Sequence, residues 1–237
     1  MKTKGCIYYT DNRIAGPIID NSRKTILASG LPIVSCSLQP IDFGDNIVLK
    51  NRNRSYPTMV DQIILCLENS KTDYVFFCEH DVLYHKSHFD YTPPTDNIYY
   101  YNVNNWRWDY PTDRIISYER LTSLSMLCCN RELVLDHFKR RRAFVGKLEW
   151  SIDRAREPRF ARLYGYEPGT KKKKRGGFSD DDFIQWRSMY PDIDIRHPKT
   201  FTKHKTQLKD FKHPPLLWKE RTIDQMSGWN LRQMFNL

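Results

Sequence analysis

Three adjacent side chains suited to chemistry, Glu79, His80 and Asp81, follow an apolar, aromatic run over residues 74–78. Carboxylates at positions i and i+2 of an extended chain point the same way, so Glu79 and Asp81 can share a hard divalent cation. Such cations usually serve substrates that carry phosphate. We therefore predict a divalent-metal site here, with Asp81 as the preferred ligand. The alternative is that both acids simply end a strand where the chain returns to water.

The elements that must position these acids form a regular alternation. The run before the acids is continuously apolar, which is typical of a strand buried on both faces of a parallel sheet. We predict a strand at residues 5–10, a helix at 18–29 that ends at Gly30, a strand at 31–37, a helix at 56–70 and a strand that ends at Asp81. This order indicates an α/β fold, in which ligands bind at the carboxyl ends of the parallel strands.

The rest of the chain is less regular. We predict a loop at residues 40–54, a strand at 97–102, an aromatic turn at 105–109, a buried strand or short helix at 121–130, a helix at 131–142, a loop at 165–177, a helix at 180–190 with Ser179 as its N-cap and a strand at 193–198. We assign residues 1–205 to one α/β domain with a mostly parallel central sheet. Residues 206–237 are predicted to form a C-terminal tail that packs on this domain.

Composition limits the cellular location and the cofactors that we expect for the chain. The chain has 237 residues and no apolar stretch of the ~18 residues that a membrane span needs. The N-terminus shows no signal-peptide pattern. None of the six cysteines forms a C-x-x-C pair, so we expect buried, reduced thiols and no zinc or redox role. A cytoplasmic location, in an infected or producing cell, is the expectation.

Three acidic or imidazole elements come in a defined order along the chain. Glu79-His80-Asp81 closes a strand, Asp180-Asp181-Asp182 follows a basic loop, and His197 ends a late strand. This order resembles the GT-A class of nucleotide-sugar glycosyltransferases over roughly residues 5 to 205. The first motif departs from the strict Asp-x-Asp of that class, because Glu79 stands at its first position. The resemblance implies a single GT-A-like, Rossmann-related domain and a donor such as a UDP-sugar.

The resemblance also implies roles for the three elements. Asp81 and His197 would hold Mn²⁺ or Mg²⁺ on the donor diphosphate, and an imidazole ligand would favour manganese. Glu79 would bind the donor, bind the metal through water or only cap the strand. Asp181, or else Asp182, would take the proton of the acceptor hydroxyl in an inverting enzyme. The alternatives are a surface histidine beside Pro198 and acids that stabilise a helix N-terminus. A retaining mechanism stays open.

The remaining donor contacts follow from the same resemblance. Tyr9, Thr10 and Asn12 lie at the end of the first strand, where this class builds its nucleotide pocket. Arg54 and Asp61 are candidates for contacts with the ribose or diphosphate, although both can equally be structural. Trp106 and Trp108 are candidates for an acceptor platform, because aromatic faces stack on sugars and bases; the alternative is that they belong to the core.

Positive charge is concentrated in one stretch. Residues 139–175 hold 14 Lys and Arg against 4 Asp and Glu, which accounts for the whole net charge of +10. The stretch includes a run of five cations next to the acid cluster: Lys171, Lys172, Lys173, Lys174 and Arg175. Such a field attracts polyanions or anionic membrane surfaces, and a solvated loop is the simpler alternative.

We therefore predict DNA as the acceptor, through the hydroxymethyl group of a pyrimidine such as 5-hydroxymethylcytosine. Virus-encoded glycosyltransferases act on such bases, and a base within duplex would have to be flipped out. The first alternative is a glycosyltransferase that acts on a cell-surface or lipid-linked glycan, held to anionic lipid by its basic segment. The second is a nucleic-acid-binding protein without enzyme activity, for which no recognised binding motif is present.

Overall fold

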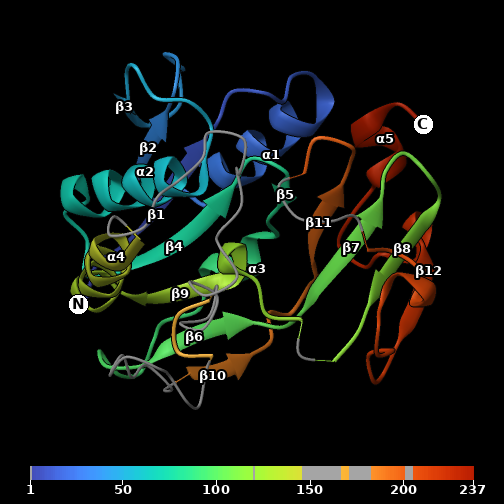
Figure 1. Cartoon of the computed structure of the whole chain (residues 1–237). Helices are drawn as coiled ribbons and strands as arrows, with labels where there is room; N and C mark the ends of the chain where they lie inside the picture. Colours follow the sequence, from blue (N-terminus) through green and yellow to red (C-terminus); the bar gives the residue numbers. More distant parts are fainter. Residues whose placement is uncertain (1, 120, 146–166, 171–182, 201–204) are drawn as a thin grey trace.

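The chain folds around two β-sheets. The computed structural model describes residues 2–119, 121–145, 167–170, 183–200 and 205–237. A seven-stranded sheet has the order β10-β6-β9-β4-β1-β2-β3, and a five-stranded sheet has the order β12-β8-β7-β11-β5. Figure 1 shows the second sheet beside the first, with α2 and α4 over one face of the first sheet and α1 on the other side. The predicted α/β class with a mostly parallel central sheet is confirmed.

The N-terminal third forms the predicted parallel half-sheet. Its strands are β1 (Lys4–Thr10), β2 (Ile33–Ser37) and β4 (Tyr74–Glu79), and its helices are α1 (Pro17–Leu27) and α2 (Tyr56–Asn69). β1 pairs in parallel with both β2 and β4, which puts Tyr9 in register with Glu79. These strands are buried along almost their whole length, as their continuous apolar pattern requires. The predicted loop at 40–54 contains one more parallel strand, β3 (Asp45–Val48).

The other half of the first sheet is mixed. β9 (Leu127–Asn130) follows a 3₁₀ turn, η1 (Leu124–Met126), and runs antiparallel to β4 and β6 (Tyr99–Asn102). Helix α4 (Arg131–Val145) confirms the helix predicted at 131–142, and it packs beside α2. The helix predicted at 180–190 is wrong, because residues 183–186 form β10 (Phe183–Trp186), parallel to β6. The strand partner satisfies the backbone groups that a helix would otherwise pair internally.

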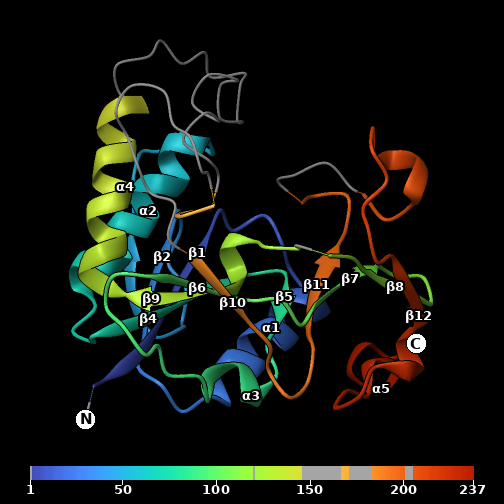
Figure 2. The same ribbon diagram turned by 90° about the horizontal axis from the view of Figure 1, so that it is seen from below.

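The second sheet was not predicted as a sheet. It contains β5 (Val82–Leu83), β7 (Asn105–Asp109), β8 (Arg114–Ser117), β11 (Asp192–Arg196) and β12 (Lys219–Thr222). The predicted aromatic turn at 105–109 is wrong, because these residues form β7, which pairs with both β8 and β11. β11 confirms the strand predicted near residues 193–198. Figure 2 shows this sheet next to the first, with β12 at the side away from α4.

The short helices complete the packing. They are α3 (Lys86–Phe89), η3 (Leu208–Asp210), η4 (Ile223–Gln225) and α5 (Leu231–Phe235). Leu231 and Phe235 of α5 join a core cluster with Trp106, Trp108 and Ile195 of the second sheet. All six cysteines are buried as free thiols. Among the described residues, no helix has the length and apolar character needed to cross a membrane.

Candidate functional site

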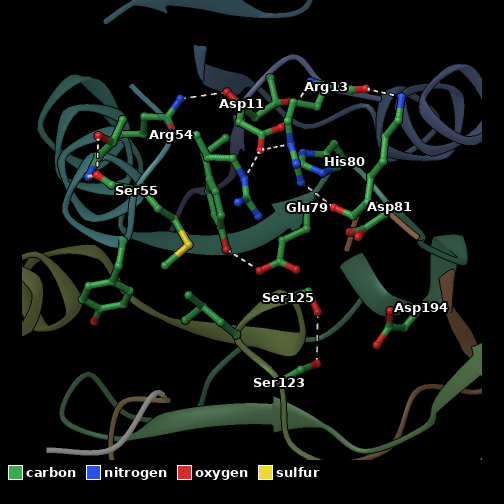
Figure 3. Close-up of a pocket in the computed structure, with 18 of the residues that line it drawn as sticks. Asp11, Arg13, Arg54, Ser55, Glu79, His80, Asp81, Ser123, Ser125 and Asp194 are labelled. Atoms are coloured by element: carbon green, nitrogen blue, oxygen red, sulfur yellow. Dashed lines mark hydrogen bonds and ion pairs between the residues drawn. The ribbon is translucent and has the colours of Figure 1, made fainter. Parts of the chain in front are cut away.

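A cavity of about 500 Å³ lies at the carboxyl ends of β1 and β4, and residues of β7 and β11 also line it. Figure 3 shows Asp11, Glu79, Asp81 and Asp194 among the lining side chains. In open α/β sheets this edge is where ligands bind. The lining combines acids, bases and small polar groups: Tyr9, Thr10, Asp11, Arg13, Leu38, Arg54, Ser55, Tyr56, Thr58, Met59, Gln62, Glu79, His80, Asp81, Arg107, Thr122, Ser123, Leu124, Ser125, Phe138, Glu167, Asp194, Arg196, Lys199 and Lys205.

Glu79 is held by the strand next to its own. The hydroxyl of Tyr9, its register partner on β1, donates a hydrogen bond of 2.6 Å to Glu79 Oε1. Burial, together with the nearby charge of Asp81, raises the pKa of Glu79 to about 8. Burial also raises the pKa of the Tyr9 phenol well above its ordinary value. Glu79 is therefore a mostly protonated acid at neutral pH when no ligand is present.

Asp81 has a different environment two residues later. Its Oδ2 lies 3.5 Å from Nε2 of His197, which comes directly after β11. Burial by itself would raise the pKa of Asp81, but the His197 hydrogen bond and the charges of His80 and Arg196 outweigh it. The pKa of Asp81 is therefore lowered, and the side chain is an ionised carboxylate in the pocket.

Asp81 and His197 supply two donors of the kind that divalent metals use. The Nε2 atom of His197 is buried and lies at the limit of hydrogen-bond range from Asp81 Oδ2, so a cation bound between the two side chains would replace that contact. Its Nδ1 accepts a hydrogen bond of 3.2 Å from the Lys199 main-chain N–H, a contact that must open for a neutral ring to bind metal through Nε2. No group of three such donors exists in the described ranges. The pair fits a metal that takes its other ligands from substrate or water.

Four arginines converge on the pocket and are held by two carboxylates. Asp11 Oδ2 accepts from Nε of Arg13 at 2.9 Å and from Nε of Arg54 at 2.7 Å. Burial would raise the pKa of Asp11, but the charge of His80 and the contacts with Arg13 lower it. Across the cavity, Asp194 lies 3.3 Å from both Arg107 and Arg196. Each carboxylate fixes two guanidinium groups in place.

Two loops are joined at the rim of the pocket. Arg13, after β1, donates to the Lys199 carbonyl oxygen at 2.6 Å, and the Lys199 ammonium donates to the Arg13 carbonyl oxygen at 3.0 Å. Residues separated by 186 positions in the sequence therefore hold each other. This contact connects the loop after β1 of the first sheet to the loop after β11 of the second.

The structure divides the residues predicted to bind the donor. Tyr9, Thr10, Arg54 and Glu79 line the cavity, and Asn12 and Asp61 do not.

Asn12 and Asp61 have structural contacts instead. Asn12 has a positive φ of 59° and accepts hydrogen bonds from the main-chain N–H groups of Leu38 and Gln39, at 2.8 and 3.0 Å. Asp61 accepts a bond of 2.5 Å from Arg142 and so joins α2 to α4. Asn12 shapes the turn after β1, and Asp61 holds two helices together.

Trp106 and Trp108 do not form an acceptor platform. They are 5% and 0% exposed and pack in the core between the second sheet and α5. The Trp108 indole donates to the Thr112 carbonyl oxygen at 2.7 Å, and the Arg221 guanidinium covers the Trp106 ring at 5.0 Å. Because both indole side chains are buried, neither can stack on a sugar. The core alternative is the correct one.

Several predicted residues lie outside the described part of the chain. These are the acids Asp181 and Asp182 and the basic run Lys171, Lys172, Lys173, Lys174 and Arg175. Their proposed roles therefore stay predictions.

Sequence reasoning missed the second wall of the pocket. Arg107, Asp194 and Arg196 were given no role, and neither were Asp11 and Arg13. A signal for two of them was present in the alternation of residues 192–196, Asp-Ile-Asp-Ile-Arg. Ile193 and Ile195 enter the core, which directs Asp194 and Arg196 to the opposite side.

Comparisons with known proteins do not identify the function of the chain, so the functional assignment rests on the pocket. No protein-family model matches the chain, and no curated protein matches its sequence. Among solved structures, it is similar to the apo form of the glycosyltransferase GlyE of Streptococcus pneumoniae TIGR4, with a TM-score of 0.40 and 11% identity. The match covers 63% of this chain and 40% of that one, so this chain spans less than half of GlyE's length. We draw no functional conclusion from a likeness at this level.

Proposed function

We propose that the protein is a glycosyltransferase that moves a sugar from a nucleotide-diphosphate sugar to a hydroxyl acceptor. One observation carries the proposal: a cation-rich cavity of about 500 Å³ lies at the carboxyl edge of a parallel sheet and contains the Asp81–His197 pair. This volume is in the range of sites for molecules of nucleotide size. The position is the one at which α/β sheets bind phosphate-bearing ligands.

The charge of the cavity favours a diphosphate. Six of the described lining residues are Arg or Lys, and guanidinium groups bind phosphate oxygens in paired hydrogen bonds. Five lining residues are acids, but Asp11 and Asp194 are engaged by arginines and Glu79 is mostly protonated at neutral pH. An anionic ligand therefore meets a net positive wall. Tyr9, Met59 and Phe138 provide an aromatic and apolar part suited to a nucleoside, and a UDP-sugar is the proposed donor.

A divalent ion is part of the proposal. When bound, Mn²⁺ or Mg²⁺ would neutralise the charge that develops on the leaving diphosphate. Asp81 and His197 are the residues that would hold it. Glu79, which accepts a hydrogen bond from the Tyr9 hydroxyl, would bind the donor or bind the metal through water. We propose Asp181, or else Asp182, as the base of an inverting reaction.

The acceptor is the part on which the two leading alternatives differ. The proposal of a hydroxymethylated pyrimidine in DNA as the acceptor is based on the positive charge of residues 139–175, most of which lie outside the described residues. A cell-surface or lipid-linked glycan is favoured by a specific observation in the described part, an exposed pair of leucines among lysines at Leu216 and Leu217. We therefore keep DNA as an acceptor to be tested and give the glycan more weight.

The test is a transfer assay followed by mass spectrometry. The protein is incubated with Mn²⁺, a mixture of nucleotide sugars, and either DNA that contains 5-hydroxymethylcytosine or an extract of lipid-linked glycans. A gain of one sugar mass on either acceptor supports the proposal and identifies the acceptor. Metal-dependent hydrolysis of one nucleotide sugar without transfer supports the donor site alone.

The matched variant is Asp81→Asn. It keeps the size of the side chain but removes the ionised ligand, so we expect at least a 100-fold loss of transfer or donor hydrolysis and of its Mn²⁺ dependence. Asp113→Asn, an exposed carboxylate far from the pocket, is the control and should retain activity. Full activity of Asp81→Asn would refute the metal site, and DNA binding without any donor turnover would favour the non-enzymatic alternative.

A further inference from the structure

A projecting apolar tip lies between η3 and β12. Leu216 and Leu217 are 71% and 68% exposed, and Leu208 on η3 is 45% exposed. Two adjacent leucines that extend into water are costly, because each leaves most of its apolar surface hydrated. We call residues 213–219, His-Pro-Pro-Leu-Leu-Trp-Lys, the LL tip.

The LL tip is held from beneath. The Tyr118 and Trp218 rings stack in parallel planes at 6.0 Å, and Phe211 meets both edge-on, at 5.3 Å from Tyr118 and 6.0 Å from Trp218. The Glu119 main-chain N–H donates to the Leu216 carbonyl oxygen at 3.0 Å. Because this aromatic base supports the tip, the leucines are presented to solvent on a formed structure.

The backbone of the LL tip is also unusual. Leu217 has a φ of 51°, a left-handed conformation that a branched apolar residue rarely adopts. Two prolines immediately before the leucines restrict the chain further. The turn at Leu217 separates the Leu216 carbonyl, which accepts from Glu119, from the stacked Trp218 ring, and it leaves both leucine side chains exposed.

Positive charge exceeds negative charge in the segment that carries the leucines. Lys209, Lys212 and Lys219 are exposed, and none of them forms a salt bridge within the described ranges. The two acids of the same segment are already engaged. Asp210 accepts from the Thr206 and Gln207 main-chain N–H groups at 3.0 and 2.9 Å, and Glu220 pairs with Arg114 at 2.8 Å. The segment that carries the leucines therefore has an excess of positive charge, with Glu119 as an exposed acid beside Leu216.

We propose that the LL tip docks the protein on an anionic lipid bilayer. Leucine side chains enter the acyl boundary, lysines meet negatively charged headgroups, and Trp218 lies at the interface between them, where tryptophan is favoured. A nucleic acid would satisfy the lysines but would leave Leu216 and Leu217 in water. A bilayer satisfies both kinds of side chain.

The LL tip and one residue of the pocket lining belong to the same chain segment. Lys205 lines the cavity, and the tip begins only eight residues later in the same segment. A protein docked by the tip would meet a hydroxyl acceptor attached to a lipid at the same membrane. This last step rests on the proposed function, but the docking itself does not.

The test is sedimentation of the full chain with vesicles. We expect binding to vesicles of phosphatidylcholine with about a third phosphatidylglycerol, and much weaker binding to phosphatidylcholine alone. The double variant Leu216→Ser/Leu217→Ser should bind the anionic vesicles at least tenfold less tightly, because its insertion surface is lost. The triple variant Lys209→Ser/Lys212→Ser/Lys219→Ser should lose about fivefold for each lysine and most of its salt dependence.

Controls separate docking from folding and from the donor site. Leu27→Ser removes a 58% exposed leucine on α1 and should bind like the unchanged protein. All variants should keep the melting temperature and the nucleotide-sugar binding of the parent, so a failed donor site would leave the vesicle result intact.

Three results would overturn the proposal. The first is that the parent does not bind anionic vesicles. The second is that the leucine variant binds them as tightly as the parent, which would place the contact in basic residues such as 139–175. The third is that the parent binds duplex DNA tightly and that only the lysine variant loses this binding.

Discussion

At the scale of single residues, the pocket contains two acids with opposite behaviour. Glu79 and Asp81 are separated by one residue, yet burial raises the pKa of Glu79, whereas His197 and neighbouring charges lower the pKa of Asp81. Neighbouring carboxylates in one site cannot both ionise freely, so their pKa values move apart. One acid is thereby kept neutral and the other charged at the same pH.

The raised pKa of Glu79 has a consequence for stability. Its ordinary value is 4.5 and its value in the folded chain is about 8, so the folded state holds a proton that the unfolded state releases. The resulting stabilisation is fully present below pH 4.5 and is lost as the pH rises through 8. We expect the free energy of unfolding to fall by about 1–3 kcal/mol between pH 5 and pH 8.

The variant Glu79→Gln checks this expectation. Glutamine resembles the protonated acid at every pH, so the variant should not lose this stabilisation. Its free energy of unfolding should therefore rise relative to that of the parent as the pH increases. Urea unfolding at several pH values measures the difference. Glu68→Gln, an exposed acid on α2, should follow the parent curve. Parallel curves for Glu79→Gln and the parent would show that Glu79 is ionised throughout.

At the scale of elements, β11 supplies both core and pocket. Ile193 and Ile195 pack in the core of the second sheet, and Asp194 and Arg196 line the cavity. Asp192, at the start of the strand, is fully buried against His88 with a contact of 2.6 Å. This strand of the second sheet therefore contacts the first sheet, where Asn102 of β6 donates to Asp192 at 2.7 Å, and it carries the Asp194–Arg196 ion pair into the site.

Removal of the Asp194 carboxylate should weaken fold and site together. Asp194→Asn leaves Arg107 and Arg196 without their shared counter-ion in a buried place, which should cost about 3–5 kcal/mol of stability. Donor binding should also weaken, since the guanidinium groups lose their fixed positions. Chemical denaturation and nucleotide-sugar titration measure the two effects. The exposed pair Asp113–Arg232 is the control, and Asp113→Asn should change stability by at most about 1 kcal/mol.

At the scale of the whole molecule, the C-terminal residues complete the second core. Phe235 of α5 meets the Trp108 ring edge-on at 4.8 Å, and both side chains are buried. The second sheet in turn forms one wall of the pocket. Stability of the C-terminal segment is therefore linked to the geometry of the site.

Phe235→Ala tests this link. The lost burial and the resulting cavity should cost about 3–5 kcal/mol. Fluorescence of the buried tryptophans and the far-ultraviolet circular dichroism should shift together in urea, because α1 contributes side chains to both cores and Ile195 of β11 donates to the Asp81 carbonyl oxygen. Leu237→Ala, at a 47% exposed position, should change little. A fluorescence transition that separates from the dichroism would instead show that the second sheet unfolds on its own.

Local pattern was sufficient for the N-terminal half-sheet. Strands β1, β2 and β4 are buried along almost their whole length, α2 carries apolar residues at helical spacing, and Gly30 follows α1 with a positive φ of 69°. The same pattern placed Tyr9, Thr10, Glu79 and Asp81 at one edge of a sheet. That inference needs only the rule that parallel strands end together.

The tertiary structure decided everything that depends on a partner distant in sequence. Residues 183–186 form a strand because β6 pairs with them, and residues 105–109 form a strand because β8 and β11 do. Trp106 and Trp108 are buried because α5 packs on them, and Asp194 lines the pocket because the second sheet packs beside the first. Sequence by itself determined which segments had a periodic apolar face and where their acids stood. It could not determine which surfaces would meet, because long-range pairing depends on the packing energy of the whole chain.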